Sequence, residues 1–309
     1  MANKQNSVMC DMETGICGVA GEKEFGIIDF NQPTKTIDLY YVTDPICSHC
    51  WAIEPVLRRF KEQYGHYFSF HTVMGGLLEK WGDGPVDPGN GIHGPADVAG
   101  HWREVGEHFR MPIDGSLMID NPVQSSFPPS RVFKVVQKHH GNAVAYEYLR
   151  RSREALFVFN QNIGETSVLE EIINQMGLDG KVIVDEAQKE SGEQLLHEDF
   201  ALTRTLGARG FPTIIMVNED NKGVRIVGGR PFEYYVDGLK RILDTEELKP
   251  KEQPTLSDLI AKEKLLFSKE IEVMYDVEKQ DIRAFVEKEL PAGSYEIKDI
   301  LGEAYIHAQ

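Results

Sequence analysis

Basic residues are scarce in this 309-residue sequence, which has 33 Lys and Arg against 49 Asp and Glu and a formal net charge of −16. Nucleic acids and anionic membrane surfaces are bound through clusters of Lys and Arg, so the composition argues against both partners. No apolar run approaches the roughly 20 residues that a bilayer-spanning helix needs. Residues 1–7 lack an apolar core behind a basic flank, so we expect no secretory signal.

Cysteine is also scarce, since the chain contains only four. Four cysteines in so long a chain do not form the disulfide framework of a small secreted domain, and we therefore expect a cytoplasmic protein. Two of them, Cys47 and Cys50, are separated by two residues. In the cytoplasm such a C-x-x-C pair is typical of a catalytic or metal-binding site rather than of a structural disulfide.

The surroundings of Cys47 predict a dithiol redox site. An apolar, β-rich strand, Ile37–Val42, precedes the pair, and a helix, Cys50–Tyr64, follows it. Cys47 is thus expected at a helix start with its sulfur toward solvent, where unpaired N–H groups and the helix dipole stabilise a thiolate. We expect its pKa to fall into the range of about 3.5–7.5. His49 adds a polar group, cationic when protonated, that would lower this pKa further.

The remaining pattern alternates strands and helices around a helical block. The further strands that we expect are Tyr67–Met74, Thr213–Val217, Gly223–Val227 and a short one at Tyr295–Leu301. A Gly- and Pro-rich loop spans residues 79–130 and is interrupted by one short helix, Ala96–Phe109. The other expected helices are Ser130–His139, Ala143–Val158, Ser167–Met176, Lys181–Gly207, Arg230–Leu243, Leu256–Tyr275 and Val277–Leu290.

This order resembles the thioredoxin fold with a helical insertion, and specifically the DsbA-like group that includes the FrnE-type dithiol–disulfide isomerases. The resemblance runs from about Thr36 to Leu243 and rests on the C-x-x-C pair, on Pro55 and on the Gly-Phe-Pro-Thr stretch 210–213. It implies an α/β protein: a thioredoxin fold with an all-helical insertion, followed by a mainly helical C-terminal extension. It also implies a cis peptide bond before Pro212, which only about 5–6% of X–Pro bonds adopt.

The expected domain organisation has four parts. They are an N-terminal extension with a cysteine pair (1–34), a thioredoxin-like domain (35–92 and 192–247), a helical insertion (93–191) and a C-terminal helical extension (255–309). Residues 267–276 are similar to the C-terminal part of the SpxH (YjbH) adapters, cytosolic DsbA-like proteins that deliver the regulator Spx to the ClpXP protease. The stretch 75–129 is longer than in those adapters and resembles the FrnE type.

The resemblance assigns roles to the dithiol. In the family the first cysteine attacks a disulfide and the second releases the substrate from the mixed disulfide, which here means Cys47 and Cys50. Pro212 is expected to keep a groove beside the sulfurs open for a substrate strand, although a proline at the start of a strand is also common. Because a stabilised thiolate favours the reduced form, we predict a pair more oxidising than thioredoxin.

Four further residues are candidates around this groove. Thr213 is expected to contact the substrate. Trp51 and Phe211 either rim the site as an apolar landing surface for unfolded peptides or belong to the core. Glu54 is either a proton relay to the resolving thiol or a solvated helix carboxylate.

Cys10 and Cys17 leave three interpretations open. They form a second redox pair that exchanges with Cys47, or they complete a zinc site with the dithiol, or they are unpaired thiols. Dithiol exchange needs no cofactor, and we expect none. We expect no metal site at three histidines whose spacing does not follow i, i+4: His93, His101 and His108.

Two features beyond the dithiol have an alternative interpretation each. The run Arg150-Arg151-Arg153 is expected on a solvated helix face or as a docking surface for an acidic partner. The loop 75–95 is a substrate lid or simply a long mobile loop. Two functions follow: a thiol–disulfide oxidoreductase or isomerase acting on protein cysteines, or an SpxH-like adapter that binds Spx for ClpXP, with the dithiol as a redox sensor.

Overall fold

The computed structural model describes residues 9–10, 17–18, 37–82 and 91–309, and the chain divides into two units, 1–35 and 36–309. In the first unit, β1 (Met9–Cys10) pairs antiparallel with β2 (Cys17–Gly18), and Cys10 lies opposite Cys17 in the backbone register. Their side chains lie outside the described part of the chain, so the three interpretations of this pair stay predictions. The second unit carries everything described below.

The second unit is built on a four-stranded sheet of order β4-β3-β5-β6. Strand β3 (Ile37–Thr43) runs parallel to β4 (Phe68–Met74) and antiparallel to β5 (Thr213–Val217), which pairs antiparallel with β6 (Gly223–Val227). The expected strands are confirmed to within one residue. β3 lies in the middle of the sheet and alternates large apolar and smaller exposed side chains only at its start, because both faces are covered further along.

Two helices pack beside α1 on the sheet and form one core with it: α2 (Glu54–Tyr64) and α9 (Phe232–Leu243). The expected single helix Cys50–Tyr64 is wrong at its start, since a short α1 (Ser48–Ala52) ends at Ile53 before α2 begins. Pro55 explains the break, because proline has no N–H to donate to the carbonyl four residues earlier. The break separates the dithiol turn from the long helix that supports it.

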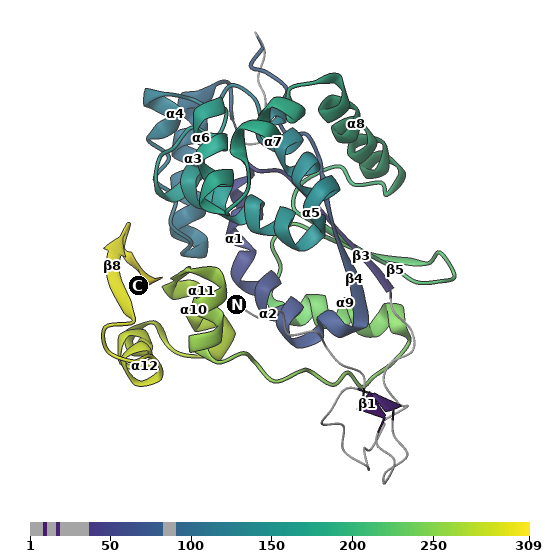
Figure 1. Cartoon of the computed structure of the whole chain (residues 1–309), viewed down its shortest axis with the longest axis vertical. Coiled ribbons are helices and arrows are strands. Elements are labelled where there is room, and N and C mark those ends of the chain that lie inside the picture. Colours follow the sequence, from purple (N-terminus) through teal and green to yellow (C-terminus); the bar gives the residue numbers. More distant parts are fainter. Residues whose placement is uncertain (1–8, 11–16, 19–36, 83–90) are drawn as a thin grey trace. The chain divides into compact units, whose positions relative to one another are not determined.

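The helical insertion packs against β4 at the edge of the sheet (Figure 1). It contains most of the largest hydrophobic core among the described residues. Its elements are α3 (Pro95–Phe109), α4 (Leu117–Asp120), α5 (Phe127–Arg153), the π-turn η3 (Glu154–Val158), α6 (Thr166–Gln175) and α7 (Gly180–Ala187). Helix α8 (Glu190–Thr205) follows the insertion and packs on β4. The expected helix Lys181–Gly207 is wrong, since it is two helices. The two expected helices on either side of residue 141 form α5, which is broken at Gly141 with φ of 83°.

The C-terminal extension contains a three-stranded sheet, of which the sequence pattern revealed only the strand expected at Tyr295–Leu301. Its elements are α10 (Leu256–Glu263), β7 (Leu265–Phe267), α11 (Ser268–Tyr275), η4 (Lys279–Asp281), α12 (Ile282–Glu289), β8 (Tyr295–Ile300) and β9 (Glu303–Ala308). The three strands pair in the order β7-β9-β8. The expected continuous helix 256–275 is therefore wrong, because Lys264 adopts a positive φ of 64° and starts the strand instead.

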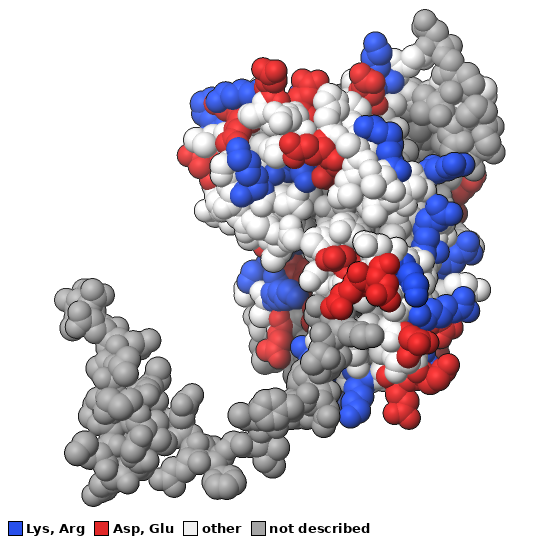
Figure 2. All heavy atoms as spheres, turned by 90° about the vertical axis from the view of Figure 1, so that its right-hand side faces the viewer, with Lys and Arg blue, Asp and Glu red and all other residues white. Residues whose placement is uncertain are grey.

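The C-terminal extension packs against the rest of the second unit. Figure 1 shows α10 and α11 beside α2, and α11 packs on that helix. Phe267 of β7 enters the core of the insertion, whereas Leu266 faces a separate core within the extension. Figure 2 shows acidic and basic side chains interspersed around a broad uncharged area on one face. No helix among the described residues combines the length and apolar character that a membrane span requires.

Candidate dithiol site

Cys47 caps the start of α1 and lies next to Cys50. The Cys47 Sγ accepts a hydrogen bond from the Cys50 backbone N–H at 3.2 Å, as a side chain at a helix N-cap does. The expectation that the Cys47 sulfur faces solvent is wrong, because the residue is only 5% exposed and Cys50 is fully buried. The thiols therefore lie beneath the surface, and access to Cys47 is through a cavity.

The protonation of the two thiols differs from the sequence-based expectation. Burial raises the pKa of Cys47 well above its ordinary value, and this outweighs the N–H group that caps the helix. Burial opposes ionisation of Cys50 as well, but the hydrogen bond from Cys47 and the positive charge of Arg153 lower the pKa of Cys50. The expected low pKa at Cys47 is thus contradicted. Of the two thiols Cys50 is therefore the first to ionise, and Cys47 then keeps its proton and donates it toward Cys50.

Arg153 provides the positive charge beneath the dithiol, and the sequence analysis did not assign it to the site. Its side chain is completely buried. The guanidinium donates to Thr43 Oγ1 at 2.5 Å, to the Asp44 carbonyl at 3.1 Å and to Glu54 Oε1 at 2.6 Å. Thr43 acts in the same direction as Arg153 and lowers the pKa of Cys50. The hydrogen bonds of the guanidinium thus orient the end of β3, which leads into the dithiol turn.

The expectation of a solvated arginine face is wrong. Arg150 and Arg153 are buried, and Arg150 pairs with Glu154 on its own helix and with Glu270 of the extension. Arg151, with a side chain 18% exposed, is the most exposed of the three arginines. Arginines on α5 can be buried because long-range carboxylates neutralise them, which a pattern within one helix does not reveal.

Glu54 is also buried rather than solvated. It is 1% exposed, and its carboxyl oxygens accept hydrogen bonds from the Arg153 guanidinium and, at 2.9 Å, from the Tyr146 hydroxyl. The solvated alternative is therefore wrong, while the proton-relay role stays a prediction. Glu54 belongs to the ion pair that holds Arg153 under the dithiol.

Asp44 is a second buried ionisable group that sequence reasoning missed. Its carboxylate accepts from the Ile46 N–H at 3.0 Å, the Leu77 N–H at 2.7 Å and the Ser126 hydroxyl at 2.8 Å. Burial outweighs these bonds and raises the pKa of Asp44 to about 6. The only local signal for it was an acidic residue directly before Pro45, three residues ahead of the C-x-x-C pair.

Pro212 follows a cis peptide bond, which confirms the geometry that the resemblance implied. Phe211 lines the dithiol cavity and packs against Gly75, where an added Cβ would lie 1.9 Å from its ring. Thr213 is buried, and its hydroxyl donates to the Gly210 carbonyl at 2.7 Å. Thr213 therefore holds the loop before Pro212, and its contact with a substrate stays a prediction.

Trp51 is a core residue. It is fully buried, donates from Nε1 to the Pro112 carbonyl at 3.1 Å, and stacks on Phe157. An edge-to-face contact with Phe267 ties it to the extension. The rim position is thus wrong for Trp51, and the core alternative is confirmed.

A cavity of about 440 Å³ opens beside Cys47. Its lining is mainly apolar and joins the dithiol turn to the insertion: Leu77, Trp81, Ile92, Trp102, Met118 and Phe211. The residues 83–90 in the expected lid lie outside the described part of the chain, so the lid stays a prediction. Cys50 lies behind Cys47 as seen from this cavity, fully buried. The cavity is suited to an apolar side chain next to the Cys47 sulfur.

His49 also lines this cavity, 5.4 Å from His101 between ring centroids. Burial, followed by the neighbouring His101 and His108, lowers the pKa of His49. The direction of this shift favours the neutral imidazole, and a neutral His49 does not lower the pKa of Cys47 as a cation would. Among the described residues no three His, Cys, Asp or Glu side chains are grouped as metal ligands. Cys10 and Cys17, which the zinc interpretation needs, lie outside the described side chains.

The fold and the dithiol define the class of protein. A strand-turn-helix with Cys47 and Cys50, a cis proline at the start of β5 and a helical insertion are the features of a DsbA-like thioredoxin-fold protein. The sequence model of the family described as thioredoxin matches residues 40–237. A putative protein disulfide isomerase from Nitrosomonas europaea superposes with a TM-score of 0.55 at 20% identity, covering 68% of this chain and 96% of that one.

Relatives that match over most of the chain narrow this class further. The chain is 30% identical to the ClpXP adapter protein SpxH of Halalkalibacterium halodurans over 285 residues, with 90% of each chain covered. It is 28% identical to SpxH of Shouchella clausii, with 88% of this chain and 87% of that one covered. The chain therefore belongs to the DsbA-like thioredoxin family and, within it, to the family of the SpxH proteins. Both resemblances drawn from the sequence are confirmed.

Proposed function

We propose that this protein is a cytoplasmic ClpXP adapter of the SpxH type, which binds the regulator Spx and presents it for proteolysis. The observation that carries the proposal is the extent of the relationship to SpxH. A match that covers 90% of the chain must include part of the 55 residues of 255–309, which lie outside the match to the thioredoxin family. An enzyme acting at the dithiol alone would not need this extension.

Buried charges support a structural role for the extension in such an adapter. Glu270 of α11 accepts from Arg58 at 3.2 Å, from Arg150 at 2.7 and 2.9 Å, and from the Phe267 N–H at 2.9 Å. All three charged side chains are at most 7% exposed. Because an unpaired buried charge is costly, the network holds the extension in one orientation on α2 and α5. The client would therefore meet a single preformed surface.

The test is the degradation of purified Spx by ClpXP with the full-length protein added. We expect the adapter to accelerate degradation, and Cys47→Ala/Cys50→Ala to retain this effect. Glu270→Gln should weaken it, whereas Glu287→Gln on α12, which is exposed and has no ion-pair partner in the described part of the chain, should not. Circular dichroism reports whether each variant is folded. Absence of acceleration by the folded wild-type protein would overturn the adapter proposal.

A second function, thiol–disulfide exchange on protein cysteines, is favoured by the geometry at Cys47. Transfer of the Cys47 proton to Cys50 leaves a Cys47 thiolate at the cavity. That thiolate attacks one sulfur of a substrate disulfide, and the other sulfur leaves with the bonding electron pair. Cys50 then loses its proton to the released substrate thiolate and attacks the Cys47 sulfur of the mixed disulfide. The second substrate sulfur leaves with the bonding electron pair, so the Cys47–Cys50 disulfide forms and the substrate is reduced by two electrons. Oxidation of a substrate is the reverse of these steps.

The cysteine variants separate the two functions. An oxidoreductase loses turnover completely in Cys47→Ala/Cys50→Ala, which insulin disulfide reduction with a coupled thiol reductant would measure. Cys50→Ala keeps the attacking thiol and should accumulate mixed disulfides that can be identified by mass spectrometry. No turnover and no trapped mixed disulfide in the folded protein would contradict exchange and leave the dithiol as a sensor.

A further inference from the structure

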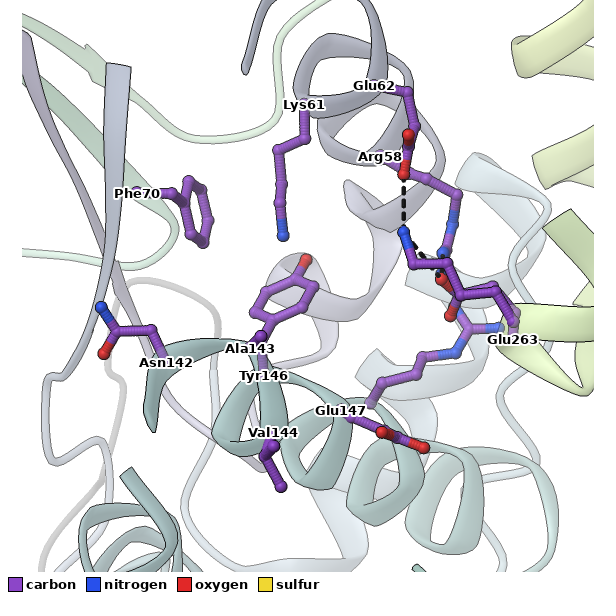
Figure 3. A pocket seen from close by; sticks show the side chains of 12 residues that line it. Arg58, Lys61, Glu62, Phe70, Asn142, Ala143, Val144, Tyr146, Glu147 and Glu263 are labelled. Carbon is purple, nitrogen blue, oxygen red and sulfur yellow. Dashed lines mark hydrogen bonds and ion pairs between the residues drawn. The ribbon is translucent and has the colours of Figure 1, made fainter. Parts of the chain in front are cut away.

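A second cavity, of about 450 Å³, lies apart from the dithiol between α2, β4, α5 and α10. Figure 3 shows the Lys61 side chain extending from α2 toward the rings of Phe70 and Tyr146. The Lys61 Nζ lies 3.5 Å from the centroid of Tyr146 and 4.2 Å from that of Phe70. The end of this lysine is thus enclosed by two aromatic faces while it remains on the wall of a cavity.

Lys61 differs from the other cations around this cavity in its partners. Arg58 pairs with Glu263 at 2.5 Å, Arg150 with Glu270 at 2.7 Å, and Lys262 with Glu62 at 2.8 Å. Within the described part of the chain, the Lys61 amine has no hydrogen-bond acceptor and no carboxylate within ion-pair distance. The amine is therefore in contact with the two rings and the cavity and is not held by an acceptor.

Several charged and titratable groups surround this amine. They are Glu54, Arg58 and Glu62 on α2, Tyr146, Glu147 and Arg150 on α5, and Lys262 and Glu263 on α10. Burial lowers the pKa of Lys61 to about 8, with Arg58 and Lys262 acting in the same direction and Glu54 and Glu263 against it. The ring faces favour the ammonium form, so the measured midpoint is a direct test of which influence dominates.

We propose that Lys61 is an acylation site that reacts with small acyl phosphates. The neutral amine attacks the carbonyl carbon and forms an amide, the phosphate leaves with the electron pair of the C–O bond, and the amine proton goes to water. Lys262 on the cavity wall, 63% exposed and bound to Glu62 through one of its three N–H donors, keeps donors for the phosphate of such a reagent. Acylation would remove the charge above Tyr146, whose hydroxyl donates to Glu54 in the network beneath the dithiol.

The experiment uses the folded full-length protein and acetyl phosphate between pH 6.5 and 9.5, with the acetylation rate of each lysine followed by mass spectrometry. Lys181, with a side chain 75% exposed, is the exposed reference. Lys134, 11% exposed and paired with Asp199 at 2.6 Å, is the enclosed but ion-paired control. Lys61→Arg keeps the charge and confirms the assignment of the modified peptide.

We expect the rate at Lys61 to reach half its maximum near pH 8. At pH 7 an amine with this pKa is neutral about two hundred times more often than an ordinary lysine, and we expect a rate at least about tenfold above that of Lys181. Lys134 should react more slowly than both. The advantage of Lys61 should vanish in 6 M urea, because the cavity is lost. A midpoint near pH 10, a rate no higher than that of Lys181, or an advantage that persists in urea would overturn the proposal.

Discussion

The charge beneath the dithiol makes the sharpest prediction. Arg153→Met removes the guanidinium and leaves the Glu54 carboxyl group without its ion-pair partner at 1% exposure. Breaking a buried pair in this way costs about 3–5 kcal/mol, a large part of the roughly 5–15 kcal/mol by which a folded protein is stable. Urea unfolding of the reduced protein, followed by circular dichroism, measures the loss.

The same helix provides a matched control. Arg151 lies on α5 with a side chain 18% exposed, and it contacts Glu147 at 3.7 Å and Glu154 at 3.0 Å. Removing Arg151 leaves no buried carboxylate unpaired, because Glu154 keeps its ion pair with Arg150. Arg151→Met should therefore cost less than about 1 kcal/mol. The double variant Arg153→Met/Glu54→Gln should recover part of the loss, because no uncompensated charge remains buried.

The redox potential of the dithiol is a second measurement, and general destabilisation of the fold does not change it. Since Arg153 lowers the pKa of Cys50, its removal should raise this pKa and make the dithiol more reducing, by about 30 mV for each pKa unit. Arg153→Lys keeps a charge and should shift the potential less. Glutathione redox titration and the pH dependence of alkylation measure both quantities. An Arg153→Met protein with the stability of Arg151→Met and an unchanged potential would refute the role of this arginine.

Three further predictions concern the neighbouring residues. Because the pKa of Asp44 is raised, the folded state keeps its proton between about pH 4 and 6, whereas the unfolded state has lost it. The stability of the wild type relative to Asp44→Asn, measured by urea unfolding, should therefore fall by about 3 kcal/mol as the pH rises through this window. A constant difference would contradict the assignment. Gly75→Ala should lower the free energy of unfolding by about 1–3 kcal/mol, because the added Cβ meets the Phe211 ring. Gly82→Ala, with open space around the added Cβ, should lower it little. Equal losses of stability in thermal unfolding would exclude the contact. The wild-type dithiol should have a potential above the roughly −270 mV of thioredoxin; a lower value in the same glutathione titration would show that the charge beneath it does not stabilise the reduced form.

The parts of the fold that follow from short periodicities could be predicted from the sequence. The strands 213–217 and 223–227 have the expected bounds, because alternation and flanking turn residues act within a few positions. Cys47 lies at the start of a helix after a strand, as its flanks indicate. The break at Ile53 was also encoded locally, in Pro55, and could have been found.

The environment of the site could not be predicted in this way. Arg153 and Glu54 are 99 positions apart, and the run of arginines on α5 has the same local pattern whether its carboxylate partners approach or not. The extension shows the same limitation, since β7 is a strand of three residues whose partner, β9, lies about forty positions later. Short apolar segments of this kind are compatible with helix or strand until a partner is present.

Residue order thus determines the dithiol turn, the strands of the central sheet and the membership of the DsbA-like family, because each depends on contacts between near neighbours or on a motif of adjacent residues. Folding of the whole chain determines which thiol holds the proton, how a positive charge comes to lie under Cys50, and how α11 is attached to α2 and α5. The physical reason is that burial and charge pairing act through space, so the pKa of a cysteine depends on groups that are distant in the sequence.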